Sequence, residues 1–170
     1  EPKDLDDAAV RLDICAKYFI EKYPRDPSGY LVNRIRKWFS ATAGTVSGVL
    51  SEERRRKITD AFTSQQWDEV LRESETAFMD GGHRWIDMQR YQALAAEGLG
   101  VEYEPVARFI VANLIDFVTT HRGVLEEKMD DGTPCASPET VEWVRMGIAS
   151  RGNLKQGGFG GKSEAFFESE

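Results

Sequence analysis

The chain has 170 residues, of which 41% are hydrophobic and 30% charged, and this length and composition suit one compact globular domain. The formal net charge is −7 and the isoelectric point is about 5.0. We therefore expect no nucleic-acid or anionic-membrane partner, because both need an excess of Lys and Arg on one face. The one basic run, residues 54–57, lies in a predicted helix that points its side chains in several directions, which indicates a solvated helix face.

Two cysteines, Cys15 and Cys135, are too few for a disulfide framework and favour a reducing compartment. Cys15 falls on the apolar side of the first helical pattern, where we expect it to be buried like a small hydrophobic residue. No apolar run approaches the roughly 20 residues that cross a bilayer, and no basic-then-apolar leader opens the chain. The sequence thus predicts a cytosolic protein without direct membrane insertion, and its start at Glu1 indicates a piece of a longer protein.

Apolar residues recur at helical spacing along almost the whole chain, beginning with a first helix that ends at Tyr23. Pro24 and Pro27 disfavour helical geometry in the residues before them, and Ser28 is expected to cap the second helix. The first helix carries Leu5, Ala8, Ala9, Leu12, Cys15, Ala16, Phe19 and Ile20 on one face, and the second carries Tyr30, Leu31, Arg34, Ile35, Trp38 and Phe39.

The middle of the chain predicts three further helices after an aperiodic, glycine-containing loop at residues 40–49. Ser51 caps the third helix, and the fourth ends at Gly81 and Gly82, which can leave a helix through positive φ. The fifth is expected to run from Trp85 to a glycine-containing stop at residues 98–100. Their inward positions are Ile58 and Phe62, then Trp67, Val70, Leu71, Ser74 and Phe78, then Trp85, Met88, Gln92 and Ala95.

Two helices complete the pattern, the sixth starting at Pro105 and the seventh after Ser137 and Pro138, an N-cap followed by proline at the first helical position. The sixth carries the longest apolar stripe, which includes Phe109, and we expect both Phe109 and Trp85 to be buried. The predicted fold class is all-α, with a single compact domain of seven helices over residues 1–150 and a glycine-rich flexible tail or linker over residues 151–170.

The search for catalytic chemistry finds one enzyme-like string, Asp130 to Pro134, and it fits neither a phosphatase loop nor a calcium loop. It lacks a preceding buried strand, and in the calcium register two of three key ligand positions have no liganding side chain. A structural turn with an aspartate-capped backbone is the better interpretation. His83 and His121 show no metal or nucleophile spacing, so we expect no enzyme activity, no metal and no cofactor.

Several short strings, in order along the chain, resemble the TssA-like, ImpA/VasJ-related proteins of type VI secretion, in the region that follows their N-terminal ImpA domain. The resemblance covers roughly residues 8–146. It rests on residues 24–27 with Tyr30, the segment from Arg34 to Trp38, Trp67 with Glu75, residues 84–91, and residues 131–136 with Thr140 and Trp143. From these strings and the Asp131–Ser137 hinge, we predict a structural motif of Trp85, Asp87, Gln89, Arg90, Tyr91, Asp131, Gly132, Thr133, Pro134, Ser137 and Trp143.

The resemblance implies a helical middle domain of a bacterial cytoplasmic scaffold that contacts the baseplate, inner tube and contractile sheath. We expect a homodimer or higher homo-oligomer formed through an apolar helix face. The hinge is expected to fix the angle between the sixth and seventh helices. The alternatives are a sheath-capping relative of the same family, an unrelated helical protein-interaction module and an enzyme with a composite active site.

Overall fold

The computed structural model describes residues 1–39 and 50–156, with side chains up to residue 150. The described residues form seven α-helices and no named strand, and an isolated antiparallel bridge joins Lys128 to Pro134. The helices are α1 (Leu5–Lys22), α2 (Ser28–Arg34), α3 (Glu52–Thr63), α4 (Trp67–Met79), α5 (Asp87–Gly98), α6 (Glu104–Thr120) and α7 (Pro138–Gln156). The predicted all-α fold with seven helices is confirmed for the described part of the chain.

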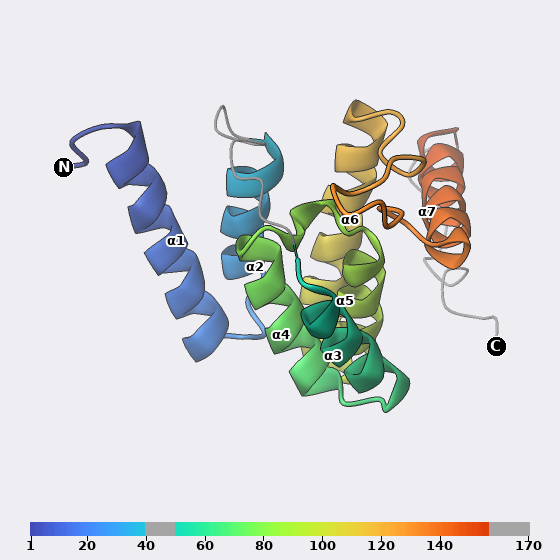
Figure 1. Ribbon diagram of the computed structural model, residues 1–170, viewed down its shortest axis with the longest axis horizontal. Coiled ribbons are helices and arrows are strands. Elements are labelled where there is room, and N and C mark those ends of the chain that lie inside the picture. Colours follow the sequence, from blue (N-terminus) through green and yellow to red (C-terminus); the bar gives the residue numbers. More distant parts are fainter. Residues whose placement is uncertain (40–49, 157–170) are drawn as a thin grey trace.

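The helices are arranged around α5, which packs against α4 and α6 along its length and also contacts α3 and α7. Figure 1 shows α1 at one edge of the molecule beside α2, and α7 at the opposite edge. The main contacts of α1 are with α2 and the turn that follows it. One end of the molecule is therefore a single helix with one principal neighbour.

The core consists of two neighbouring clusters of buried residues, and the partly buried Trp143 packs against both. In the larger one, the indole of Trp38 stacks on the ring of Phe117 with 4.4 Å between centroids, an arrangement that adds to the burial of both side chains. Trp85 is buried as predicted, whereas Phe109 is only partly buried. The larger cluster also holds Ile58, Val70, Phe78, Met88, Leu114 and Val144, and the smaller one holds Tyr30, Leu71, Ala93, Val106 and Ile110.

Several predicted helix boundaries are confirmed by their capping geometry. The Ser51 side chain accepts a hydrogen bond from the Arg54 backbone N–H at 3.3 Å, which satisfies one of the unpaired donors at the start of α3. After α4, Gly81 has a φ of 117°, which favours glycine because a side chain is strained in that conformation. The basic run on α3 divides among separate ion pairs, with Arg54 bound to Asp80 and Arg55 bound to Asp131.

Two predicted boundaries are wrong. Ser28 is the first residue of α2 and makes no cap; its backbone N–H instead donates to the Asp26 carboxylate at 2.8 Å. The fifth helix begins at Asp87, because residues 82–84 form a short 3₁₀ turn and Trp85 has an extended backbone. The indole of Trp85 nevertheless points into the core, so its predicted burial did not depend on a helical backbone.

The prediction that Cys15 is buried is wrong, because this residue is exposed on α1. Leu5 and Leu12, on the same side of this helix, are 61% and 42% exposed. Only Ala9 and Ala16 of α1 are buried, because α2 covers one strip of its apolar face. On the rest of that face, Ile20 packs against the smaller core cluster, Ala8 and Phe19 are partly buried, and Leu5, Leu12 and Cys15 are exposed.

The final helix, α7, runs to Gln156, which takes it into the segment predicted as a tail. Residues 157–170, like the predicted loop at residues 40–49, lie outside the described residues. Among the helices of the described chain, none combines the length and apolar character that a membrane span requires.

Candidate functional site

Two of the strings singled out in the sequence meet at the start of α5, where the Asp87 carboxylate accepts three hydrogen bonds. One oxygen, Oδ1, accepts from both the backbone N–H and the side-chain hydroxyl of Ser137, each at 2.8 Å. The other, Oδ2, accepts from the indole N–H of Trp85 at 3.2 Å. Asp87 is buried, so these donors replace the water that a carboxylate would otherwise need.

The same contact continues into α7. Ser137 caps this helix, since its hydroxyl oxygen accepts from the Thr140 backbone N–H at 3.3 Å. The Arg90 guanidinium of α5 donates through Nε to the Thr140 hydroxyl at 2.9 Å. In addition, the Ile86 N–H donates to the Cys135 carbonyl at 2.7 Å. We call Asp87, Arg90, Ser137 and Thr140 the α5–α7 clamp, because they join segments about 50 residues apart.

The turn before the clamp is the aspartate-capped structure predicted from the sequence. Asp131 Oδ1 accepts from the Thr133 backbone N–H at 3.0 Å, and Gly132 has a φ of 82°. The Thr133 N–H and the Arg55 guanidinium, whose nitrogen lies 2.6 Å from Asp131 Oδ2, lower the pKa of Asp131 to about 2. The turn is thereby attached to α3, and Pro134 pairs with Lys128 across its base.

The hinge residues therefore bond to α5 and α3, and among the described residues none of their hydrogen bonds goes to α6. The helix α7 itself packs against both α6 and α5, and the effect of the hinge on the angle between α6 and α7 stays a prediction. The residues that the hinge contacts, Arg55, Ile86 and Asp87, lie far from it in sequence. Periodicity along the chain could not reveal them.

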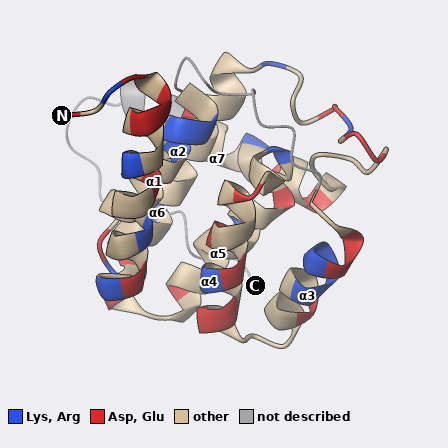
Figure 2. Ribbon diagram, turned by 60° about the vertical axis from the view of Figure 1, so that its left-hand side comes forward, with Lys and Arg blue, Asp and Glu red and all other residues tan. Residues whose placement is uncertain are grey.

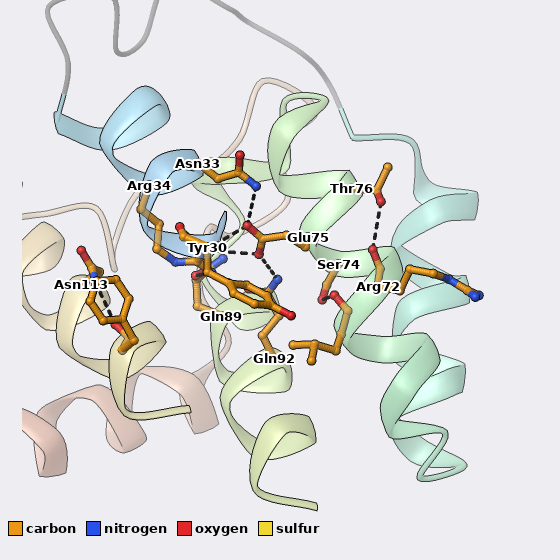
Figure 3. Close-up of polar contacts among 12 residues, drawn as sticks. Tyr30, Asn33, Arg34, Arg72, Ser74, Glu75, Thr76, Gln89, Gln92 and Asn113 are labelled. Carbon is orange, nitrogen blue, oxygen red and sulfur yellow. Dashed lines mark hydrogen bonds and ion pairs between the residues drawn. The ribbon is translucent and has the colours of Figure 1, made fainter. Parts of the chain in front are cut away.

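A second polar cluster lies in the centre of the molecule, where the fully buried Arg34 of α2 faces Glu75 of α4 (Figure 3). The guanidinium Nη1 lies 3.0 Å from Glu75 Oε1, and it also donates to the Tyr30 carbonyl at 3.0 Å. Its Nη2 donates to the side-chain carbonyls of Gln89 at 2.8 Å and Gln92 at 2.9 Å, both on α5. One guanidinium thus joins three helices.

The carboxylate of Glu75 has further donors, from Asn33 Nδ2 at 2.7 Å and from Gln92 Nε2 at 2.6 Å. The Arg34 guanidinium carbon also lies 4.9 Å from the centroid of the Phe78 ring, a cation–π contact. A buried charge of each sign is therefore neutralised by its partner and by amides, as burial requires. We call Asn33, Arg34, Glu75, Gln89 and Gln92 the buried network.

The sequence analysis singled out several residues of this network but did not predict that they contact one another. Arg34 and Gln92 stand among apolar residues at helical spacing, and Glu75 and Gln89 belong to the resembling strings. A charged residue at an inward position is the signal that a buried partner exists, although it does not say which residue the partner is.

The other predicted motif residues pack beside these two clusters. The Tyr91 ring stacks on Phe62 of α3 with 4.4 Å between centroids, and it meets the Trp85 ring edge-on at 5.9 Å. The Arg90 guanidinium lies 5.3 Å from the Tyr91 ring centroid. Trp143 is partly buried between the two core clusters. The structure thus places Gln89 in the buried network, and the remaining motif residues in the clamp, in its turn or in packing beside them.

Two further titratable side chains, His83 and Cys135, are buried outside these clusters. Burial, with Lys37 and Arg84 nearby, lowers the pKa of His83 to about 4, and burial raises the pKa of the Cys135 thiol. Within the described residues, no three His, Cys, Asp or Glu side chains gather closely enough to hold a metal ion. A groove of about 510 Å³ lies beside the network, between α1, α2 and α4. The polar contacts of both clusters join helices to one another.

Residues 3–165 match the family model described as "Type VI secretion, EvfE, EvfF, ImpA, BimE, VC_A0119, VasJ". No curated protein matches the chain. The match spans nearly the whole chain and includes every residue of the clamp and of the buried network. The chain therefore belongs to the ImpA/VasJ family of type VI secretion proteins.

Proposed function

We propose that this chain is a non-catalytic scaffold domain of a type VI secretion system, and that it organises the assembly of baseplate, tube and sheath in the bacterial cytoplasm. Its family supports a role in type VI secretion. The observation that carries the scaffold function is the use of the polar motif residues: the side chains of Asp87, Arg90 and Ser137 bond across the α5–α7 contact. A scaffold needs such fixed helix geometry to present its surfaces.

The surface is consistent with a protein that binds other proteins. Lys and Arg are interspersed with Asp and Glu along the described helices (Figure 2). Eleven large hydrophobic residues among the described ones are exposed, and many of them lie on α1. Exposed apolar residues in contiguous groups mark protein interaction surfaces. We further propose that the chain self-associates as a homodimer or a higher homo-oligomer.

The test compares loss of the domain with loss of single polar groups in the native host. Deletion of residues 3–165 should abolish sheath formation, as scored by fluorescence microscopy of labelled sheaths. The single variants His83→Ala, His121→Ala, Asp130→Ala, Asp131→Asn and Cys135→Ser should still form sheaths and secrete wherever they remain folded, because a scaffold concentrates binding in a few anchors and tolerates most polar changes.

One folded variant that blocked secretion while its sheaths assembled normally would point to a chemical site, since removal of a catalytic group typically costs orders of magnitude in rate. Folding of each variant is checked on the purified protein by circular dichroism and thermal unfolding. A folded variant that forms sheaths but does not secrete would contradict the proposed function.

A further inference from the structure

One side of α1, next to its buried strip, carries an apolar stripe with the spacing of a coiled-coil seam. Its members, Leu5, Ala8, Leu12, Cys15 and Phe19, alternate steps of three and four residues, which keeps them on one side of a helix. Leu5 is 61% and Leu12 42% exposed, Cys15 is also exposed, and Ala8 and Phe19 are partly buried. We call these five residues the α1 stripe.

The stripe is adjacent to the strip of α1 that α2 covers. Ala9 and Ala16, which immediately follow Ala8 and Cys15, are buried, and α2 is the main neighbour of α1. Figure 1 shows α1 at the edge of the molecule, beyond α2. A further helix laid on the stripe would therefore pack against α1 on the side that the described part of the chain leaves open.

The sizes of the stripe residues fit a second copy of α1 that runs in the opposite direction. Pairing residues whose numbers add to 27 places Phe19 opposite the second copy's Ala8, and Leu12 opposite its Cys15. The Phe19–Ala8 and Leu12–Cys15 layers then each combine a large side chain with a small one and can interdigitate, and Leu5 lies opposite Lys22 of the second copy at each end of the seam. A parallel pair would instead set Phe19 against Phe19 and Ala8 against Ala8, which combines overpacking with a cavity.

The charges of α1 favour the same direction. Residues 5–13 carry three aspartates and one arginine, a net charge of −2, whereas residues 14–22 carry two lysines and one glutamate, a net charge of +1. An antiparallel pair brings each acidic half beside a basic half, and Lys22 comes to the start of the second copy's helix near its Asp4. A parallel pair aligns like charges, which is unfavourable.

We propose that α1 is the self-association surface of this chain, and that two copies pair their α1 stripes antiparallel about a two-fold axis between Leu12 and Cys15. The inference rests on the self-association included in the proposed function, and it names the face and the direction. Such a contact is isologous, since the same stripe serves both copies and no unmatched stripe is left to continue the assembly.

The first test is sedimentation of the purified chain over a range of concentrations, with the variants Leu12→Glu and Ile14→Glu. Both positions are exposed on α1, at 42% and 64%, but only Leu12 belongs to the stripe. Wild type and Ile14→Glu should form dimers of equal affinity, and Leu12→Glu should weaken the dimer at least about tenfold, because a buried unpaired charge is costly. Circular dichroism checks that both variants remain helical.

The second test fixes the direction with spin labels, one on Asp6→Cys and one on Glu21→Cys. Because Cys15 belongs to the stripe, the background is Cys15→Ala, and sedimentation must first show that this background dimerises like the wild type. In the antiparallel pair, labels at the same position are offset by about 22 Å along the axis, and a mixed pair of Asp6→Cys and Glu21→Cys has almost no axial offset. A parallel pair reverses the two results.

Three outcomes overturn the α1 pairing: a monomer at all concentrations, a Leu12→Glu protein that dimerises like Ile14→Glu, and a parallel set of distances. A dimer through another face leaves the scaffold function standing, since sheath formation after deletion of the domain tests that function separately. The predicted result, loss of the dimer in Leu12→Glu alone together with antiparallel distances, establishes both the face and the direction.

Discussion

Among single residues, Asp87 illustrates how a sequence motif in this chain becomes structure. Its carboxylate accepts from the indole of Trp85 two residues ahead of it and from the backbone and hydroxyl of Ser137, 50 residues later. Ser137 in turn caps α7. One carboxylate therefore fixes the entry to α5 and the entry to α7 at the same point.

Replacement of Ser137 by alanine tests this arrangement. The variant loses the cap of α7 and one of the bonds to Asp87, so unfolding in urea should show a loss of about 1–2 kcal/mol. Ser51→Ala, which removes a cap from α3 where no second side-chain partner is seen among the described residues, is the matched control and should cost about 1 kcal/mol. In a double-mutant cycle with Asp87→Ala, Ser137→Ala should cost clearly less than it does alone. Additive effects would show that the two side chains do not act together.

His83 gives a prediction on pH. Its pKa is lowered from 6.5 to about 4 by burial and by Lys37 and Arg84. Between these two values the unfolded chain binds a proton that the folded chain does not, so stability decreases as the pH falls from 6.5 towards 4. An NMR titration of the His83 ring should show a midpoint near 4, and His83→Gln should flatten the pH dependence of stability in this window. A midpoint near 6.5 would contradict the burial argument.

For single residues, the sequence correctly predicted side chains that bond to the backbone a few positions away. Asp131 caps its own turn, and Ser137 caps the helix that it precedes, because both bonds reach only two or three residues along the chain. Two residue predictions were wrong, namely that Ser28 caps α2 and that Cys15 is buried. The Asp26 side chain accepts a hydrogen bond from the backbone N–H of Ser28 itself, and Ser28 is already the first residue of α2 instead of its cap. Exposure of Cys15 depends on how much of α1 a neighbouring helix covers.

Among the helices, the buried network decides how α2, α4 and α5 sit together. Arg34 comes from α2, Glu75 from α4, and Gln89 and Gln92 from α5. Asn33 Oδ1, Arg34 Nε and Gln89 Nε2 are buried without a hydrogen-bond partner among the described residues. A pairing of this kind selects one relative position of the three helices, since any shift leaves a buried charge unpaired.

Glu75→Gln should therefore be among the most damaging single changes. It leaves the Arg34 guanidinium buried without its counter-charge, and loss of one partner of a buried pair costs about 3–5 kcal/mol. Combined with Arg34→Met, which removes that charge, the damage should be less than the sum of the two single variants. Unfolding in urea gives all three values.

The control for this prediction is the surface pair of Arg25 and Glu102, which is shorter, at 2.7 Å against 3.0 Å for the buried pair, but 60% exposed at both side chains. Glu102→Gln should change stability by less than about 1 kcal/mol, because water already solvates both groups. Equal costs for Glu75→Gln and Glu102→Gln would contradict the role given to burial.

Periodicity predicted the helices themselves well because each helix is specified by its own apolar face and its own caps. α3, α4 and α6 begin or end where Ser51, Gly81 and Pro105 indicated. It could not predict which polar residues meet, because Arg34 and Gln92 are 58 positions apart and nothing in either segment specifies the other. The helix-five boundary failed for a related reason, since Trp85 is buried from an extended backbone.

In the whole molecule, polar bonds join the central helices to one another, whereas α1 at one edge has an exposed apolar surface. The clamp and the buried network join α2 to α5 and α7, whereas α1 is attached mainly through α2 and leaves its stripe exposed. We propose that the polar motif residues serve secretion through the fold and that the apolar edge serves it through contacts with other proteins. On this account, secretion should depend on the polar motif residues only to the extent that folding does.

That claim is tested most directly by one plot: the number of sheaths per cell in the native host against the unfolding free energy of the purified chain. The variants are Ser51→Ala, Ser137→Ala, Asp87→Ala, Arg34→Met, Glu75→Gln and Glu102→Gln. All points should fall on a single curve that drops only when instability depletes the folded protein. A stable, fully folded clamp or network variant that lay far below the curve would contradict the account, because its side chain would then be acting on something other than the fold.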